Sequence, residues 1–267
     1  MAVILSGQIR NARYCFPSVD KFILQKYSPD VFIETWYPDS EIVSWNDGIQ
    51  KDTLTIEQLI KMYQPKCISI EDFKGEISRC IDEITKEIPV HGNRPNNVYS
   101  MYYKIYKSFL QLSNFTQSNQ NYYDYIIRLR FDLEFETFPD LNELNSDQIN
   151  IPIGWDWLNG VNDLLAIGNY ANIKKYCELF LKFRDYTKMG ISTHPETLLR
   201  THLELENLSV NRFPLKYYLG SKRHSVHTTE INETPIFYIP PSRILTTKPA
   251  SSPPSVKWAT PDDLLNP

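Results

Sequence analysis

Short apolar runs alternate with segments of helical periodicity over the first 220 residues. The runs are rich in β-branched and aromatic side chains and end at Gly, Pro or polar residues, which is typical of strands. We expect strands at 2–6, 30–36, 66–70, 122–136, 148–153, 164–167 and 208–213. We expect helices at 17–27, 56–63, 75–87, 98–112 and 170–183, and after 194. The opening β-α-β-α-β order predicts an α/β fold with a mostly parallel central sheet flanked by helices.

Local signals support two of the helix starts. Thr55 and Gln58 have the spacing of a capping box in front of the helix at 56–63. Pro195 suits the first position of a helix, and the charge of Glu196 is favourable near a helix N-terminus. A further helix should therefore begin directly after His194.

Charged residues interrupt the apolar run at 122–136. A strand buried in an α/β sheet is nearly continuously apolar, yet Arg128 and Arg130 lie inside this run and Asp132 and Glu134 at its carboxyl end. Ligands of open α/β sheets bind at the carboxyl ends of strands. An acid-x-acid pair there can hold a divalent cation that bridges to phosphates. The alternative is a surface cluster on an edge strand, in which the arginines pair with the carboxylates.

Context gives the Asp132 pair its weight. The chain contains four acid-x-acid pairs, which is about the number expected by chance. Only the run that starts at Asp132 ends a hydrophobic strand preceded by arginines. Two other strand ends carry polar groups: 2–6 leads into Gly7 and Arg10, and 30–36 carries Glu34. A strand followed by glycine and a polar turn can present backbone N–H groups to a ligand.

Composition narrows the class of protein. The 267 residues are 42% hydrophobic and 22% charged, as in soluble globular proteins. A net charge of −4 leaves no basic field for nucleic acid. The four cysteines lack metal-site spacing, so reduced thiols are expected. The N-terminus lacks a basic flank and no run reaches about 18 apolar residues, so we expect no signal peptide, no transmembrane segment and a cytoplasmic location.

The composition changes after Gly220. No glycine follows it, and eight of the 18 prolines lie at 235–267. We therefore expect one domain at 1–220 and an extended, proline-rich segment at 221–267 that packs on it. No phosphate loop with a lysine and no GxGxxG fingerprint occurs anywhere in the chain.

Six motifs together resemble glycosyltransferase-like proteins of the GT-A fold, which occur in bacterial surface-polysaccharide gene sets and in large DNA viruses of the chlorella type. The motifs are ILSGQIRN, SPDVFIETW, YYKIYKSF, YDYIIRLRFDLEF, NDLLAIGNY and HPETLLRTHL, and they span residues 2–203. The resemblance implies transfer of a sugar from a nucleotide donor, commonly a UDP-sugar, to a glycan acceptor in surface or viral glycan synthesis. For a viral protein the location would be the host cytoplasm.

The resemblance also implies roles for single residues. GT-A enzymes bind Mn²⁺ or Mg²⁺ with an acid-x-acid motif, here Asp132 and Glu134, in which Glu replaces the usual second Asp. A late histidine often completes the metal site; His194, His202, His224 and His227 are the candidates here, with His227 the first choice. The residues that would face the donor by analogy are Ser6, Gly7, Arg10 and Glu34. Arg10, Arg128 and Arg130 are available to stabilise the charge on the leaving diphosphate.

An inverting enzyme also needs a carboxylate that accepts the proton of the acceptor hydroxyl. Asp163 and Glu196 are the candidates, with Asp156 third; alternatively Asp163 forms a turn and Glu196 only caps a helix. The aromatic loop at 154–160, with Trp155, Asp156 and Trp157, is a candidate acceptor platform, or a packed loop with one exposed tryptophan.

Two other functions remain open from the sequence. The first is a carbohydrate-binding module on a degenerate GT-A scaffold without turnover, which the Asp132-x-Glu134 departure and the loop at 154–160 favour. The second is a nucleotidyltransferase, which the missing glycine-rich phosphate loop disfavours. The sequence identifies neither the sugar, the acceptor nor the stereochemistry, and it is compatible with a homodimer.

Overall fold

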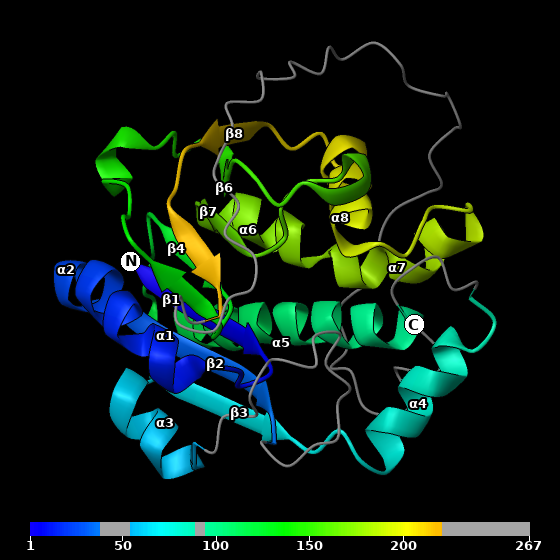
Figure 1. Ribbon diagram of the computed structural model, residues 1–267, viewed down its shortest axis with the longest axis horizontal. Coiled ribbons are helices and arrows are strands. Elements are labelled where there is room, and N and C mark those ends of the chain that lie inside the picture. Colours follow the sequence, from blue (N-terminus) through cyan, green and yellow to red (C-terminus); the bar gives the residue numbers. More distant parts are fainter. Residues whose placement is uncertain (38–53, 89–93, 221–267) are drawn as a thin grey trace.

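A seven-stranded sheet forms the centre of the computed structural model, which describes residues 1–37, 54–88 and 94–220 (Figure 1). Its strand order is β3-β2-β1-β4-β7-β6-β8. The strands are β1 (Ala2–Gly7), β2 (Asp30–Trp36), β3 (Cys67–Glu71), β4 (Ile126–Leu129), β6 (Ile149–Pro152), β7 (Leu165–Gly168) and β8 (Val210–Phe213). Strands β3, β2, β1 and β4 are parallel, and β7 is antiparallel to β4 and β6. The predicted α/β fold with a mostly parallel sheet is confirmed.

Helices cover both faces of this sheet. They are α1 (Ala12–Val19), α2 (Gln25–Tyr27), α3 (Ile56–Tyr63), α4 (Glu76–Thr85), α5 (Pro95–Asn119), α6 (Tyr170–Cys177), α7 (Leu179–Lys188) and α8 (Pro195–Leu205). The π-helical segment η1 (Asp20–Leu24) joins α1 to α2, and η2 (Leu141–Glu143) and η3 (Trp157–Asn159) are short 3₁₀ turns. The predicted helices are all present, although the one at 170–183 divides into α6 and α7.

Side chains alternate between two hydrophobic cores, as the period of a strand requires. Ala2 and Ile4 of β1 face a core shared with α5, α6, α7 and α8. Val3 and Leu5 face the other core, shared with α1 and α3. Helix α5 packs along β1 and β2 and crosses the centre of the view in Figure 1. Ser6 follows Ile4 on the same face of β1, so the Ser6 side chain points toward α5.

Local signals and structure agree at the helix ends. Thr55 accepts a hydrogen bond from the Gln58 backbone, and the Gln58 side chain accepts one from the Thr55 backbone, so the capping box is confirmed. Helix α8 begins at Pro195 as expected. Helix α5 is longer than predicted, because Pro95 opens it and Gln120, in a left-handed conformation, closes it.

The run at 122–136 is not one strand. It forms β4, a turn, and then β5 (Leu133–Phe135), which leaves the main sheet. Strand β5 pairs antiparallel with β9 (Tyr217–Leu219), and the Gly220 N–H donates to the Asp132 carbonyl at 2.6 Å. The partner strand lies about 85 residues downstream in the chain. No local pattern at 122–136 announces that partner, so the sequence did not show the division.

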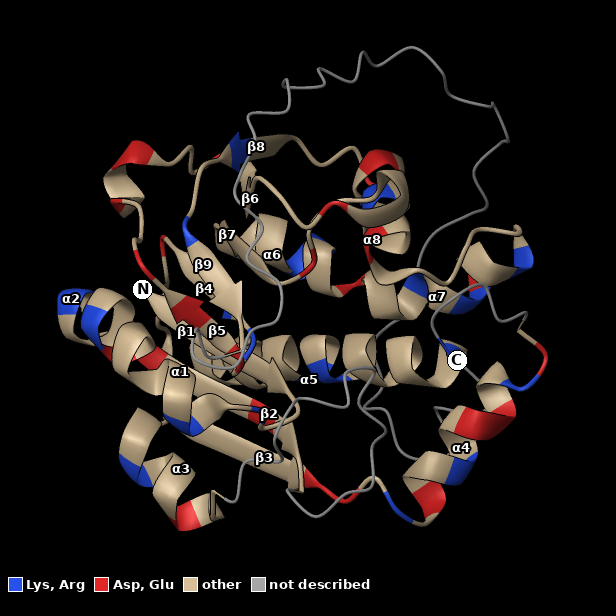
Figure 2. Cartoon of the chain, in the orientation of Figure 1, with Lys and Arg blue, Asp and Glu red and all other residues tan. Residues whose placement is uncertain are grey.

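Two expectations lie outside the described residues: the proline-rich segment 221–267 and His227. Within the described ranges, no helix combines the length and the apolar character that crossing a membrane requires. Figure 2 shows basic and acidic residues interspersed along the described elements, in keeping with the small net charge.

Candidate functional site

The carboxyl ends of β1 and β4 meet where the chain order of the sheet reverses. From β1 the chain proceeds to β2 and β3 on one side, while β4 lies on the other. Ile4 pairs with Arg128 and Leu5 with Leu129, so the two strands end side by side. In α/β sheets such a switch point is the usual ligand site. Gly7 ends β1 with a φ of 106°, a conformation that other residues rarely adopt.

Arg130 and Asp132 form a bidentate ion pair directly after β4. Arg130 donates from Nε to Oδ1 at 2.9 Å and from Nη2 to Oδ2 at 2.8 Å. Asp132 is buried, whereas the Arg130 side chain is 20% exposed. Burial is the largest single influence and would lower the pKa of Arg130, but the charge and hydrogen bonds of Asp132, together with the charges of Asp163 and Glu196, outweigh it and the pKa rises. The guanidinium therefore stays charged and is held in one orientation, on a side chain that is partly exposed.

Arg10 lies beside this pair. The turn after Gly7 is closed by a bond from the Arg10 N–H to the Gln8 carbonyl, and Nε donates to the Gln8 side chain. Burial lowers the pKa of Arg10, with Asp132 raising it and Arg130 lowering it in smaller measure. The guanidinium of Arg10 is therefore electrostatically coupled to both members of the Arg130–Asp132 pair, and its expected role at the donor stays a prediction.

Arg128 has a different environment. It is one of the largest fully buried side chains, and its Nη1 donates to the Asp163 carbonyl oxygen. The Tyr176 hydroxyl lies 3.5 Å from the same oxygen. Arg128 therefore ties β4 to the segment in front of β7 and places a buried guanidinium against the Asp163 backbone.

Glu196 lies close to Asp163 at the start of α8. Burial, and next the charge of Asp163, raise the pKa of Glu196 to about 8, while Arg130 acts in the opposite direction. His194 Nδ1 lies 3.0 Å from Glu196 Oε2, and burial lowers the pKa of His194. Near neutral pH a protonated Glu196 therefore faces a neutral imidazole. Such a pair can hold or release one proton near physiological pH.

The loop at 154–160 is fastened to the first turn of α8. The Val161 N–H donates to the Glu196 carbonyl at 2.9 Å. A Cβ atom on Gly160 would lie less than 3.0 Å from the Glu196 backbone, so only glycine fits there. This contact places the candidate acceptor loop directly beside the candidate proton-transfer residue.

The loop itself combines a packed and an exposed tryptophan. Trp155 packs against the core under β1, whereas Trp157 is 56% exposed. Trp155 and Leu158 have φ values of 60° and 49°, which is strained for such side chains. Asp156 bridges to Arg212 at 2.8 Å and accepts from the Asn162 N–H, which holds the strained loop in place.

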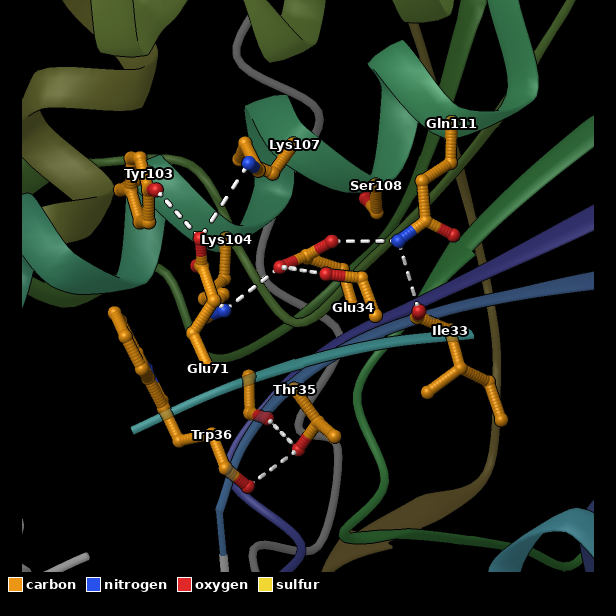
Figure 3. A network of polar contacts seen from close by, with 12 residues as sticks. Ile33, Glu34, Thr35, Trp36, Glu71, Tyr103, Lys104, Lys107, Ser108 and Gln111 are labelled. Carbon is orange, nitrogen blue, oxygen red and sulfur yellow. Dashed lines mark hydrogen bonds and ion pairs between the residues drawn. The ribbon is translucent and has the colours of Figure 1, made fainter. Parts of the chain in front are cut away.

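Glu34 belongs to a second cluster, on the α5 face of β2 (Figure 3). Lys104 Nζ lies 2.7 Å from Glu34 and 2.6 Å from Glu71, and both Lys104 and Glu34 are fully buried. Gln111 also donates to Glu34, and Lys104 sits 3.9 Å from the centre of the Trp36 ring. Both Glu34 oxygens thus have partners on α5, and the role at the donor that analogy suggested stays a prediction.

The predicted site residues therefore fall into separate places. Arg10, Arg130, Asp132, Asp163 and Glu196 come together at the ends of β1 and β4. Ser6 lies at the end of β1, and its buried hydroxyl has no hydrogen-bond partner among the described residues. His194 was predicted only as the residue before a helix and as one of several candidate metal ligands. A histidine two residues before a candidate carboxylate is the sequence signal that could have identified it.

The donors around Asp132 do not suit Mn²⁺ or Mg²⁺, which need several oxygen ligands. Both oxygens of Asp132 already accept from Arg130, and a cation on this carboxylate would meet the guanidinium charge. Leu133 and Phe135 of β5 point into the core, so Glu134 points to the opposite face. Among residues 1–37, 54–88 and 94–220, no three His, Cys, Asp or Glu side chains form a group that could hold a metal ion.

Comparison with known proteins does not assign a family, because neither a family model nor a curated protein sequence matches the chain. Function must therefore be argued from the geometry. The arrangement combines guanidinium groups suited to an anion, a titratable pair suited to proton transfer, and an exposed aromatic side chain on the loop that is fastened to the start of α8.

Proposed function

We propose that this chain is a glycosyltransferase with a GT-A-like architecture, which moves a sugar from a nucleotide donor, first of all a UDP-sugar, to a glycan acceptor. The observation that carries the proposal is the meeting of Arg10 and Arg130 with Asp163 and Glu196 at the switch point of a mostly parallel sheet. The resemblance of six motifs to GT-A proteins supports sugar transfer over other reactions of nucleotides. A cytoplasmic role in surface or viral glycan synthesis follows from the same resemblance and stays a prediction.

Sugar transfer from a nucleotide donor requires two kinds of group. As the bond between the sugar and the diphosphate breaks, negative charge gathers on the leaving diphosphate, and Arg10 and Arg130 stabilise it. The acceptor oxygen forms the new bond to the sugar carbon, and its proton must go to a base. Glu196 takes that proton in its ionised form, and His194, 3.0 Å away, is placed to relay it. Asp163 tunes the pair, because its charge raises the Glu196 pKa.

A donor screen tests this proposal. Purified protein is incubated with common UDP-, GDP- and CDP-sugars, and release of the nucleoside diphosphate is measured with and without added glycans. We expect release from one donor class, lost in Glu196→Gln. Arg79→Lys is the matched control, because Arg79 is exposed on α4, far from β4 in Figure 1. Absence of release from every donor, together with no thermal shift by any of them, would refute the proposal.

A non-catalytic carbohydrate-binding module is the second candidate. The exposed Trp157 on a strained loop favours it, since aromatic faces stack on sugars and strain often marks a binding site. Glycan binding that is lost in Trp157→Ala, without any release of nucleoside diphosphate, would support this candidate instead.

A further inference from the structure

The orientation of Arg130 has a specific physical cause. Its Nε and Nη2 are both engaged by the buried carboxylate of Asp132, at 2.9 and 2.8 Å. The third nitrogen, Nη1, makes no hydrogen bond with any of the described residues, and the side chain is one-fifth exposed. A two-bonded pair of this kind fixes the plane of the guanidinium. Asp132 therefore orients Arg130 and leaves the Nη1 edge of its guanidinium available to a ligand.

The charge around this edge is positive. Arg10, Arg128 and Arg130 lie with the carboxylates of Asp132 and Asp163, a surplus of one positive charge. Glu196 does not cancel it near neutral pH, because burial and Asp163 raise its pKa to about 8. The nearby Asp156 is paired with Arg212. Such a site attracts an anion, whereas a divalent cation would add to charge that is already in excess.

We propose that Asp132 is a positioning residue for Arg130, and that Arg130 and Arg10 bind the diphosphate of the nucleotide donor without a divalent cation. This inference rests on the proposed function and replaces the metal site that the resemblance implied for Asp132 and Glu134. Arginine is suited to the task because its planar fork matches phosphate oxygens in pairs. The leaving diphosphate would then be stabilised by fixed charges that the fold holds in place before the donor arrives.

Calorimetric titration of the full chain tests the inference with two probes. Inorganic pyrophosphate in EDTA reports on the anion site without any base or sugar. UDP is titrated both in EDTA and in Mn²⁺. We expect pyrophosphate to bind in EDTA, and we expect the Kd of UDP to change by less than about twofold between the two buffers.

Variants separate positioning from metal binding. Arg130→Lys keeps the charge but loses the fork, and should weaken UDP binding about tenfold in both buffers. Asp132→Asn has a similar shape but loses the carboxylate that orients Arg130. It should weaken UDP binding by the same factor in EDTA as in Mn²⁺, because Asp132 acts on the ligand through Arg130. A merely structural role for Asp132 would lower the melting temperature and leave the Kd of the folded protein unchanged. Arg79→Lys is again the control.

The outcomes are distinct. UDP binding that requires Mn²⁺ and disappears in Asp132→Asn overturns this inference and leaves the transferase proposal standing. Pyrophosphate binding in EDTA that depends on Arg130, without turnover of any sugar donor, upholds the anion site and overturns sugar transfer. Absence of binding, both of pyrophosphate in EDTA and of UDP in either buffer, overturns the inference.

Discussion

Replacing Lys104 with methionine should destabilise the fold more than most single substitutions. Lys104 is the fully buried cation between Glu34 and Glu71, at 2.7 and 2.6 Å (Figure 3). Methionine has nearly the same length but no charge, so Glu34 would lose its cationic partner in the core and keep only the hydrogen-bond donors Gln111 and Ser69. Removing one partner of a buried ion pair costs about 3–5 kcal/mol. That corresponds to a fall in melting temperature of roughly 10 °C in a domain of this size.

A control lies three residues further along the same helix. Lys107 is 28% exposed and 3.4 Å from Glu71, so Lys107→Met should cost less than about 1 kcal/mol. Adding Glu34→Gln to Lys104→Met removes the stranded charge and should recover a large part of the loss. Urea unfolding followed by tryptophan fluorescence measures all three free energies.

The pH dependence gives a second check. Burial raises the pKa of Glu34, and the charge of Lys104 opposes that rise. Without Lys104 the pKa of Glu34 in the folded protein lies still further above its value in the unfolded chain. The free energy of unfolding of the variant therefore falls as the pH rises above the unfolded pKa. The cost of Lys104→Met should therefore be largest near neutral pH and should shrink toward about pH 5. The reasoning is refuted if Lys104→Met costs no more than Lys107→Met, or if the double variant is less stable than the single one.

Three further predictions concern the site and its supports. Because the pKa of Glu196 is raised to about 8 and only its ionised form accepts a proton, turnover should rise through about pH 8, and a flat kcat profile from pH 6 to 9 would contradict this. Gly160→Ala should lower turnover and cost about 1–3 kcal/mol of stability, because the new Cβ would collide with the Glu196 backbone. Gly168→Ala is the milder comparison, since a Cβ there would have its nearest contacts at 3.3 Å or more. Equal effects of the two substitutions would argue against the collision. Thr55→Ala should cost about 1 kcal/mol by removing the cap of α3, whereas Thr55→Ser should cost much less, as chemical denaturation would show.

Much of the fold could be predicted because its determinants are local. The first three strands, their crossover helices and the start of α8 follow from hydrophobic period and from single capping residues. Those signals act within one or two turns of chain, so they are readable without the rest of the molecule. The parallel arrangement of β1, β2 and β3 follows from the same order of elements.

The candidate site was predicted only in part. Arg10, Arg130 and Asp132 attract notice because charge at the end of an apolar strand needs a partner. The alternative in which the arginines pair with the carboxylates matches what Arg130 and Asp132 do, although Asp132 is buried and β4 lies inside the sheet, not at its edge. The sequence could not tell a metal ligand from a partner of arginine, since both require the same carboxylate.

What only the tertiary structure decided is which distant groups share a buried environment. Glu34 meets Lys104 seventy residues later, on a helix that covers β2. Glu196 acquires its raised pKa because α8 places it beside Asp163 and out of water. Strand β5 leaves the main sheet because β9 is there to pair with it. Chain sequence specifies each of these residues, but burial and charge coupling depend on what the fold packs over them.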